Sequence, residues 1–142
     1  MAIANVMKML HINNQAVRNP LDLLGLFQAG LFAKTIEILE KNLSVKPKDM
    51  ARLLSLSPRT IDRYRVDSKK KLIPAISERV IKIAMVKDRS EDVFEDSKAA
   101  TAWLKSESMA LGGKTPLELM EFDLGIDLVM KELIRIEHGV VS

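Results

Sequence analysis

The chain has 142 residues, of which 47% are hydrophobic and 29% are charged, the balance of a folded globular protein rather than a disordered one. This length suffices for one ordinary domain or two small ones, and the absence of cysteine excludes disulfides and thiolate metal sites. Because no signal peptide is evident and no apolar stretch is long enough to cross a bilayer, we expect a cytoplasmic protein that does not enter a membrane.

Charge is distributed unevenly along the chain. Residues 46–71 contain nine Lys or Arg and three Asp, a net charge of +6. Residues 91–142 contain five Lys or Arg and eleven Asp or Glu, a net charge of −6. Since a phosphate backbone is attracted to the first stretch and repelled by the second, the two are expected to have different partners.

An all-α fold is predicted, because Gly and Pro are sparse and alternating β-branched residues are absent. Residues 1–18 have no firm periodicity, and we leave them unassigned as an N-terminal arm, either flexible or used in dimer packing. Asn19-Pro20 is typical of a helix start, and Gly30 is expected to end that helix. A second helix is expected over about 31–41, with Asn42 able to close it.

The stretch from Pro47 to Val66 has the pattern of a helix, a tight turn and a second helix. Ser44 is a candidate cap for the first helix, and Ser57-Pro58 is typical of the start of the second. Ser55 occupies the turn position where glycine is usual, because the backbone there is commonly left-handed. Apolar residues fall where two such helices face each other: Met50, Ala51, Leu54, Leu56, Ile61 and Tyr64.

The second helix of this pair has a polar, basic face of the kind that enters a major groove. Arg can donate two hydrogen bonds to guanine, while Asp can accept one from cytosine or orient a neighbouring cation. The alternative is a solvated helix face. The basic loop that follows either touches the DNA backbone or is a solvated linker. The candidate DNA-binding residues are Ser57, Arg59, Thr60, Asp62, Arg63, Arg65, Lys69 and Lys70.

The remainder of the chain is predicted to be helical, with recognisable signals for the starts and ends of the helices. A long helix from about Pro74 towards Phe94 is expected to bridge the two halves. Further signals are the cap Asp96, the paired turn residues Gly112 and Gly113, the capping-box pattern of Thr115, Pro116 and Glu118, and a final helix over about 123–138 that Gly139 ends. Trp103 is expected to pack within this half, the alternative being an exposed anchor for a partner.

Enzymatic chemistry is not expected. His11 and His138 lie in different halves, and neither has a carboxylate at metal-ligand spacing. No serine lies in a nucleophile elbow, and no pair of carboxylates is placed across a cleft by any pattern. We therefore predict no catalytic residue, no metal and no cofactor.

The C-terminal half contains a series of short motifs: Ala100–Leu104 (ATAWL), Ala110–Pro116 (ALGGKTP), Leu117–Met120 (LELM), Gly125 and Ile136–Val140 (IEHGV). In this series it resembles the C-terminal domain of the Xre/MbcA/ParS-type antitoxins, in which an Xre-like helix-turn-helix precedes a small helical toxin-binding domain. The resemblance covers about residues 30–140 and has no counterpart for residues 1–18. We therefore expect an unassigned arm 1–18, a helix-turn-helix domain for DNA binding and dimerisation 19–73, and a toxin-binding domain 74–142.

This resemblance implies an antitoxin that covers the active site of a RES-domain toxin, which consumes NAD or transfers ADP-ribose from it. It also implies a homodimer that represses its own promoter through the helix-turn-helix. The implied toxin contacts are Lys114, Arg135, Glu137, His138, Gly139 and Val140. For this tail the alternative is a frayed terminus. Two other functions stay open: an interaction protein whose helix-turn-helix serves only for dimerisation, and a transcriptional regulator that responds to a small ligand.

Overall fold

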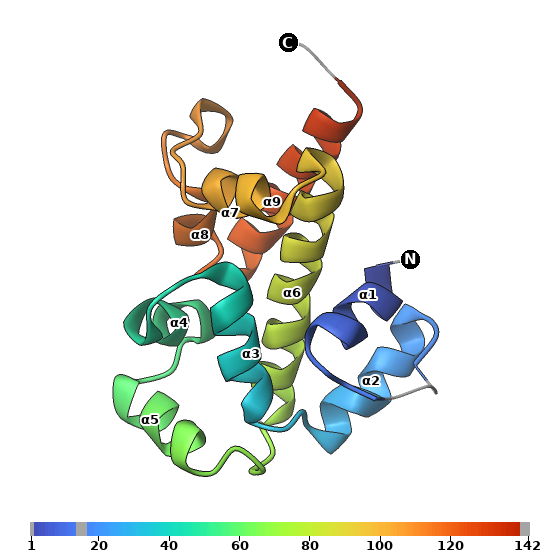
Figure 1. Ribbon diagram of the computed structural model, residues 1–142, viewed down its shortest axis with the longest axis vertical. Helices are drawn as coiled ribbons and strands as arrows, with labels where there is room; N and C mark the ends of the chain where they lie inside the picture. Colours follow the sequence, from blue (N-terminus) through green and yellow to red (C-terminus); the bar gives the residue numbers. More distant parts are fainter. Residues whose placement is uncertain (1, 14–16, 140–142) are drawn as a thin grey trace. The chain divides into compact units, whose positions relative to one another are not determined.

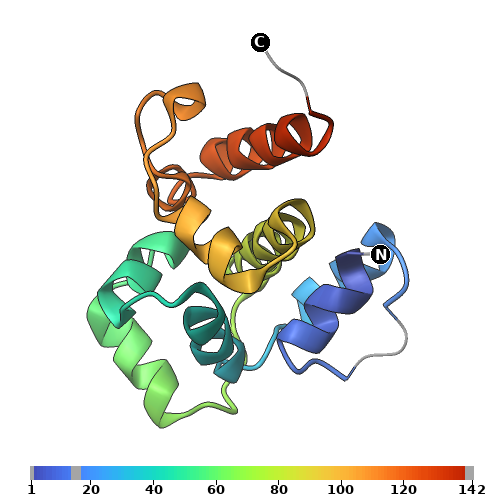
Figure 2. The same cartoon turned by 45° about the horizontal axis from the view of Figure 1, so that its top comes forward.

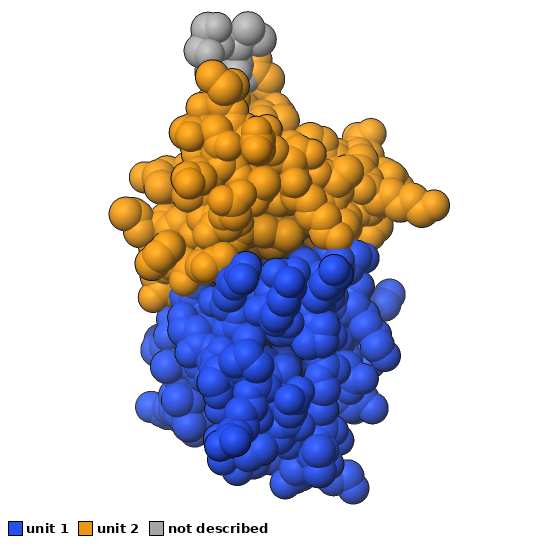
Figure 3. Space-filling model, turned by 90° about the vertical axis from the view of Figure 1, so that its left-hand side faces the viewer, with its two compact units in different colours: residues 1–85 blue, residues 86–142 orange. Residues whose placement is uncertain are grey.

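The computed structural model describes residues 2–13 and 17–139, and there the regular elements are helices, apart from two isolated bridges (Figure 1). The chain divides into two compact units, residues 1–85 (unit 1) and 86–142 (unit 2), coloured separately in Figure 3. This division falls inside the long helix α6 (Pro74–Phe94), whereas the sequence placed a boundary just before that helix. None of the helices in the described part of the chain is long and apolar enough to span a membrane.

Unit 1 is organised around α3 (Lys34–Leu43). This helix contacts α1, α4 and α5, and it lies between α1 on one side and α4 with α5 on the other in both ribbon views (Figures 1 and 2). The other helices of the unit are α1 (Ala2–Met9), α2 (Pro20–Ala29), α4 (Pro47–Leu54), α5 (Pro58–Val66) and the first part of α6. Ile36, Leu39 and Leu43 are buried on α3 and form the centre of this core.

The N-terminal segment is helical, where the sequence had left an unassigned arm. Ile3 and Val6 are buried on α1, and Leu10, just after its last residue, is buried at the same helical spacing. An isolated helix of eight residues is marginal in water, so α1 depends on this packing rather than on its own propensity. The apolar spacing is present in the sequence, but so short a stretch does not predict a stable helix without the residues that it packs against.

The ends of α2 follow the sequence prediction. The Asn19 side chain accepts a hydrogen bond from the Asp22 N–H at 3.0 Å, and Pro20 is the first helical residue. Gly30 ends the helix with a φ of 86°. A Cβ atom at this position would lie 2.5 Å from the Leu72 carbonyl oxygen, so glycine is required by both the backbone angle and the close approach.

Two expectations about α3 and α4 are wrong. Asn42 lies inside the last turn of α3, where its side chain donates to the Ile38 carbonyl at 3.0 Å. Ser44 ends α3 in a left-handed conformation with a φ of 53°, and its N–H bonds to carbonyls of the last turn. Ser44 therefore belongs to the end of α3, and the N-cap of α4 is Lys46, which has an extended backbone.

Unit 2 contains the second part of α6, then α7 (Ser97–Leu104), the 3-10 turn η1 (Met109–Leu111), α8 (Pro116–Leu119) and α9 (Asp123–Glu137). α9 packs against α8 and η1. The predicted cap and capping box are confirmed: Asp96 accepts from the Ala99 N–H at 2.9 Å, and Thr115 and Glu118 bond each other's backbone N–H groups.

Close packing joins α8 to α9. Gly125 is buried in the first turn of α9, and a Cβ atom on it would lie 1.6 Å from the Leu119 carbonyl oxygen. No side chain fits there without moving the backbone. Trp103 is half-buried and its ring packs on Phe94, with centroids 5.5 Å apart and planes tilted by 38°.

A buried lysine lies in the part of α6 that belongs to unit 2. The side chain of Lys87 has no exposed surface, and its Nζ lies 3.1 Å from Ser97 Oγ and 3.4 Å from Glu91 Oε2. The hydroxyl and the carboxylate offset the cost of removing the ammonium from water. α6 and the start of α7 are thereby linked through a charged group.

Candidate functional site

The helix, turn and helix from Pro47 to Val66 have the local geometry that the sequence predicted. Ser55 is left-handed with a φ of 55°, and Ser57 Oγ accepts the Thr60 N–H at 3.1 Å at the start of α5. Between the two helices, Met50, Ala51, Leu54 and Ile61 are buried, while Leu56 and Tyr64 are half-buried. Ala51 is 2% exposed, as expected where the two helices approach each other.

The pair is attached to the rest of unit 1 by two polar side chains that sequence reasoning did not single out. Arg79 on α6 is buried, and its Nε donates to the Leu53 carbonyl at 2.5 Å. That carbonyl belongs to the last turn of α4, which has no partner inside its own helix. Glu40 on α3 is also buried and bonds Arg65 of α5 at 2.5 Å. Both contacts limit how α4 and α5 can move.

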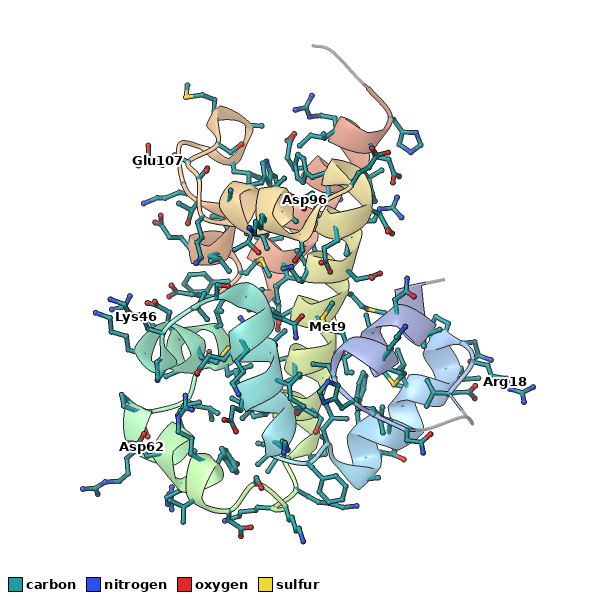
Figure 4. The ribbon with its side chains drawn as sticks, in the orientation of Figure 1. Met9, Arg18, Lys46, Asp62, Asp96 and Glu107 are labelled. Carbon is teal, nitrogen blue, oxygen red and sulfur yellow. The ribbon has the colours of Figure 1, made fainter. Side chains whose placement is uncertain are left out.

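The outward face of α5 carries cations and one carboxylate. Arg59, Asp62 and Arg63 are exposed, and Figure 4 shows Asp62 among side chains that project away from α3. Thr60 is half-buried, with its hydroxyl 3.0 Å from Ser57 Oγ and 3.3 Å from Arg63 Nη2. Ser57 and Thr60 are therefore engaged in the start of the helix, and Arg63 donates to the Thr60 hydroxyl while its side chain stays exposed. Arg59 and Asp62 are exposed beside it.

Arg65 differs from the other candidate residues on α5. Its hydrogen bond with Glu40 raises the pKa of its guanidinium above the ordinary value, against a smaller opposing effect of burial. The side chain of Glu40 is 10% exposed, so the carboxylate relies on this partner. Arg65 thus holds α5 to α3, a role that the sequence pattern did not distinguish from DNA contact.

The basic loop after α5 is attached to the start of α3 through its backbone. The Ala33 N–H donates to the Lys70 carbonyl at 2.7 Å, the Lys34 N–H to the Ser68 carbonyl at 3.0 Å, and the Leu72 N–H to the Leu31 carbonyl at 2.8 Å. We call these three bonds the loop tether. The Lys69 and Lys70 side chains are exposed. These bonds fix the backbone of the loop, and its exposed lysines lie just after α5.

In unit 2, the candidate contacts lie in two places. Lys114 is exposed just after Gly112 and Gly113, in a turn where the Ser108 N–H bonds the Lys114 carbonyl at 3.0 Å. Arg135, Glu137, His138 and Gly139 lie at or just after the end of α9. Val140 lies outside the described residues.

Two candidates at the end of α9 are held by ion pairs within unit 2. Arg135 Nε donates to the buried Glu132 carboxylate at 2.6 Å, and this bond raises the pKa of the arginine. Glu137 accepts from Arg89 Nη2 on α6 at 2.5 Å. His138 and Gly139 follow on the surface, and Gly139 turns the chain with a φ of 64°. The last turn of α9 is thus fixed, and His138 is the first side chain beyond it.

Exposed apolar side chains on unit 2 were not among the candidates. Met109 is 92% exposed on η1, and Phe122 and Leu124 are each 70% exposed at the start of α9. The sequence did indicate this exposed apolar face, since Leu124 and Leu128 are four residues apart and fall outside the buried stripe of α9.

No group of three or more His, Asp or Glu side chains placed to hold a metal ion occurs in residues 2–13 and 17–139.

Most of unit 2 matches one family of known proteins. Residues 89–139 match the family described as the antitoxin Xre/MbcA/ParS C-terminal toxin-binding domain. "Antitoxin Xre" of Photorhabdus laumondii subsp. laumondii is 33% identical over 95 residues, which make up 66% of this chain and 64% of that protein. The "Prs ADP-ribosylating antitoxin" of Sphingobium sp. (strain YBL2) is 27% identical over 133 residues, or 87% of this chain and 83% of that protein.

The fold is also found in a solved structure. A chain of the M. tuberculosis MbcT–MbcA toxin–antitoxin complex superposes with a TM-score of 0.58 at 21% identity, covering 78% of this chain and 96% of that one. This likeness supports the all-α fold that the sequence predicted. The family match itself is confined to residues 89–139, the toxin-binding domain of the Xre/MbcA/ParS antitoxins.

Proposed function

We propose that this protein is an antitoxin that neutralises a partner toxin by direct contact through unit 2. The observation that carries the proposal is the match of residues 89–139 to a toxin-binding domain. The fixed end of α9 supports it, because the Arg89–Glu137 pair holds the last turn of the helix. A rigid helix end can occupy a pocket at a smaller entropic cost than a mobile tail.

The proposed partner is a RES-type toxin that consumes NAD or transfers ADP-ribose. The printed name of the Sphingobium relative joins an antitoxin to ADP-ribosylation, which favours this class of chemistry. In this proposal Lys114, His138, Gly139 and Val140 reach the active site of the toxin. Arg135 and Glu137 act there through the ion pairs that hold α9 in place.

Co-expression of this chain with the RES-type toxin of its own operon tests neutralisation by growth rescue. A chain that stops after Glu137 keeps the Arg89–Glu137 pair and removes only the residues that follow α9. We expect this truncated chain to remain folded and to lose most of the rescue. The matched control is Lys8→Gln, an exposed lysine of unit 1. Full rescue by the truncated chain would exclude a role for the tail.

We further propose that α5 binds the promoter of the same operon and represses it. Arg59 and Arg63 are exposed on its outward face, Asp62 lies between them, and the loop tether holds Lys69 and Lys70 beside the same helix. A homodimer would match two half-sites about 34 Å apart, one turn of DNA. Salt-dependent retention of a promoter fragment tests this proposal. Binding that does not weaken with salt, or no binding at all, would favour a pair of helices used only for dimerisation.

A further inference from the structure

A groove of about 870 Å³ lies in unit 1, beside α3 and the loop that follows α5. Its walls come from the segment after α1, the end of α2 with its connection to α3, and the loop that follows α5. The floor is apolar, formed by Leu10, Leu26, Leu31 and Ile38. Its volume falls within the range of pockets that bind small molecules, about 300–1,000 Å³.

The charged side chains that line this groove are lysines, and His11, Asn13, Thr35 and Ser68 complete its polar lining. Lys34, Lys69 and Lys71 line it, and no Asp or Glu is among its described lining residues. Lys71 Nζ lies 5.5 Å from the centre of the Phe32 ring, so one ammonium is placed over an apolar wall. Glu37, in the adjoining hollow, lies 3.7 Å from Lys41 and is engaged there. The groove thus combines an apolar floor with positive charge that nothing in its own lining neutralises.

This combination selects a ligand with two parts. A neutral apolar ligand would fill the floor and leave the ammonium groups unmatched, whereas a small polar anion would leave the floor exposed to water. An alkyl chain that ends in a carboxylate satisfies both, because its methylenes displace water from the leucines and its head forms charge-assisted hydrogen bonds with lysine. We propose that the groove binds an amphiphilic carboxylate of medium chain length.

The loop tether gives this site a link to the proposed function. Lys69 lines the groove and is also a candidate DNA contact, and the backbone of its loop is bonded to the start of α3. A bound carboxylate reduces the positive charge that this loop offers to a phosphate backbone. If the promoter binding proposed above is correct, a saturating ligand weakens it by up to about fivefold, the scale of one surface charge pair.

Calorimetric titration of the full chain with decanoate, kept below its micelle concentration, tests the site without DNA. We expect saturable binding that weakens about fourfold for each methylene removed, measured with octanoate. Decanol and decyltrimethylammonium carry comparable alkyl chains without the negative charge, and both should bind at least tenfold more weakly. Lys34→Gln should weaken decanoate binding several-fold, whereas Lys8→Gln, which changes an exposed lysine outside the groove, should not.

Ile38→Glu places a carboxylate on the floor and should abolish binding, with circular dichroism to verify the fold. If this variant does not fold, Lys34→Gln remains the test. Equal affinity for decanol and decanoate, or an unchanged affinity in Lys34→Gln, would overturn the proposal. So would an acidic apolar peptide that binds where decanoate does not. A chain that binds decanoate but not its promoter would refute the proposed repression and leave this site standing.

Discussion

The two units use charge in different ways. In unit 1, Arg59 and Arg63 on α5 form no ion pair among the described residues, and Lys69 and Lys70 extend from a tethered loop. In unit 2, cations are matched to carboxylates of the same unit, as Lys87 is to Glu91 and Arg89 to Glu137. The difference is one of degree, because unit 1 also contains ion pairs such as Arg65–Glu40 and Arg52–Asp49. The arginines named above without an ion pair lie on α5, whereas the cations named in unit 2 stabilise that unit.

This contrast shows that the number of charges in a segment does not identify the charges that bind. Arg65 is only two residues from Arg63 and belongs to the same basic stretch, yet it pairs with a buried carboxylate on α3. Arg135 belonged to the candidate toxin contacts, yet it pairs with buried Glu132. Each has a structural role, because removing it would leave a carboxylate without its partner.

The largest effect on stability is expected at the close contact between α8 and α9. Gly125→Ala puts a Cβ atom 1.6 Å from the Leu119 carbonyl oxygen. We expect the free energy of unfolding to fall by about 4 kcal/mol or more, with loss of the packing between α8 and the first turn of α9. Fluorescence of Trp103, the only tryptophan, reports on this unit during urea unfolding. The matched control is Gly25→Ala on an exposed face of α2, where no atom lies within 4 Å, and a gain of about 0.5–1 kcal/mol is expected. A normal urea midpoint for Gly125→Ala would contradict the close packing.

The second effect concerns the matched charges of unit 2. Lys87→Ala removes a fully buried side chain and leaves Glu91 without its cation, for a loss of about 3 kcal/mol. Lys87→Met keeps most of the buried volume and should lose less than the alanine variant. The same fluorescence measurement applies. Equal stability of Lys87→Ala and the unchanged protein would mean that the ammonium contributes nothing to unit 2.

The third effect separates two arginines on one helix. Arg65→Ala should cost unit 1 about 2 kcal/mol, because the buried Glu40 loses a charged hydrogen bond. Arg59→Ala should leave stability within about 0.5 kcal/mol and lower the salt dependence of promoter binding by about one unit of slope. Arg18→Ala, an exposed arginine outside α5, is the control for net charge. If Arg59→Ala binds the promoter like Arg18→Ala, the outward face of α5 does not contact DNA.

The smallest effect concerns the turn between α4 and α5. Ser55→Gly should stabilise unit 1 by about 0.5–1 kcal/mol, since glycine adopts the φ of 55° without a Cβ penalty. Ser57→Ala should cost about 1 kcal/mol by removing the cap on Thr60. Thermal unfolding followed by circular dichroism measures both. Changes of the opposite sign would mean that the turn is held by other contacts.

Much of the local structure was predictable, because helix ends depend on neighbouring residues. The caps at Asn19, Ser57 and Asp96 and the capping box at Thr115 are all present. Each needs only a side-chain oxygen two or three residues ahead of a free N–H, and a sequence displays that spacing directly. The left-handed backbone at Ser55 was also predictable, because it follows from the position of this residue in the turn between two helices.

The features that escaped prediction depend on residues far apart in the chain. Burial of Lys87 requires Ser97 on the next helix, and the roles of Arg65 and Arg79 require carboxylate and carbonyl partners on α3 and α4. The burial of α1 depends on its neighbours in unit 1. A single sequence contains no spacing rule for such pairs, so the candidate sites were found as stretches, without the division into binding and supporting side chains.

The loop tether has a practical consequence for work with this protein. Lys69-Lys70-Lys71 resembles a flexible linker, the kind of place where a protease would cut or a tag would be inserted. Three inter-segment backbone bonds make it the reverse. The amide protons of Ala33, Lys34 and Leu72 should exchange slowly with deuterium, and trypsin should cleave this lysine run more slowly than its composition suggests. An insertion there would separate the end of α5 from the start of α3, so fusions are better placed elsewhere.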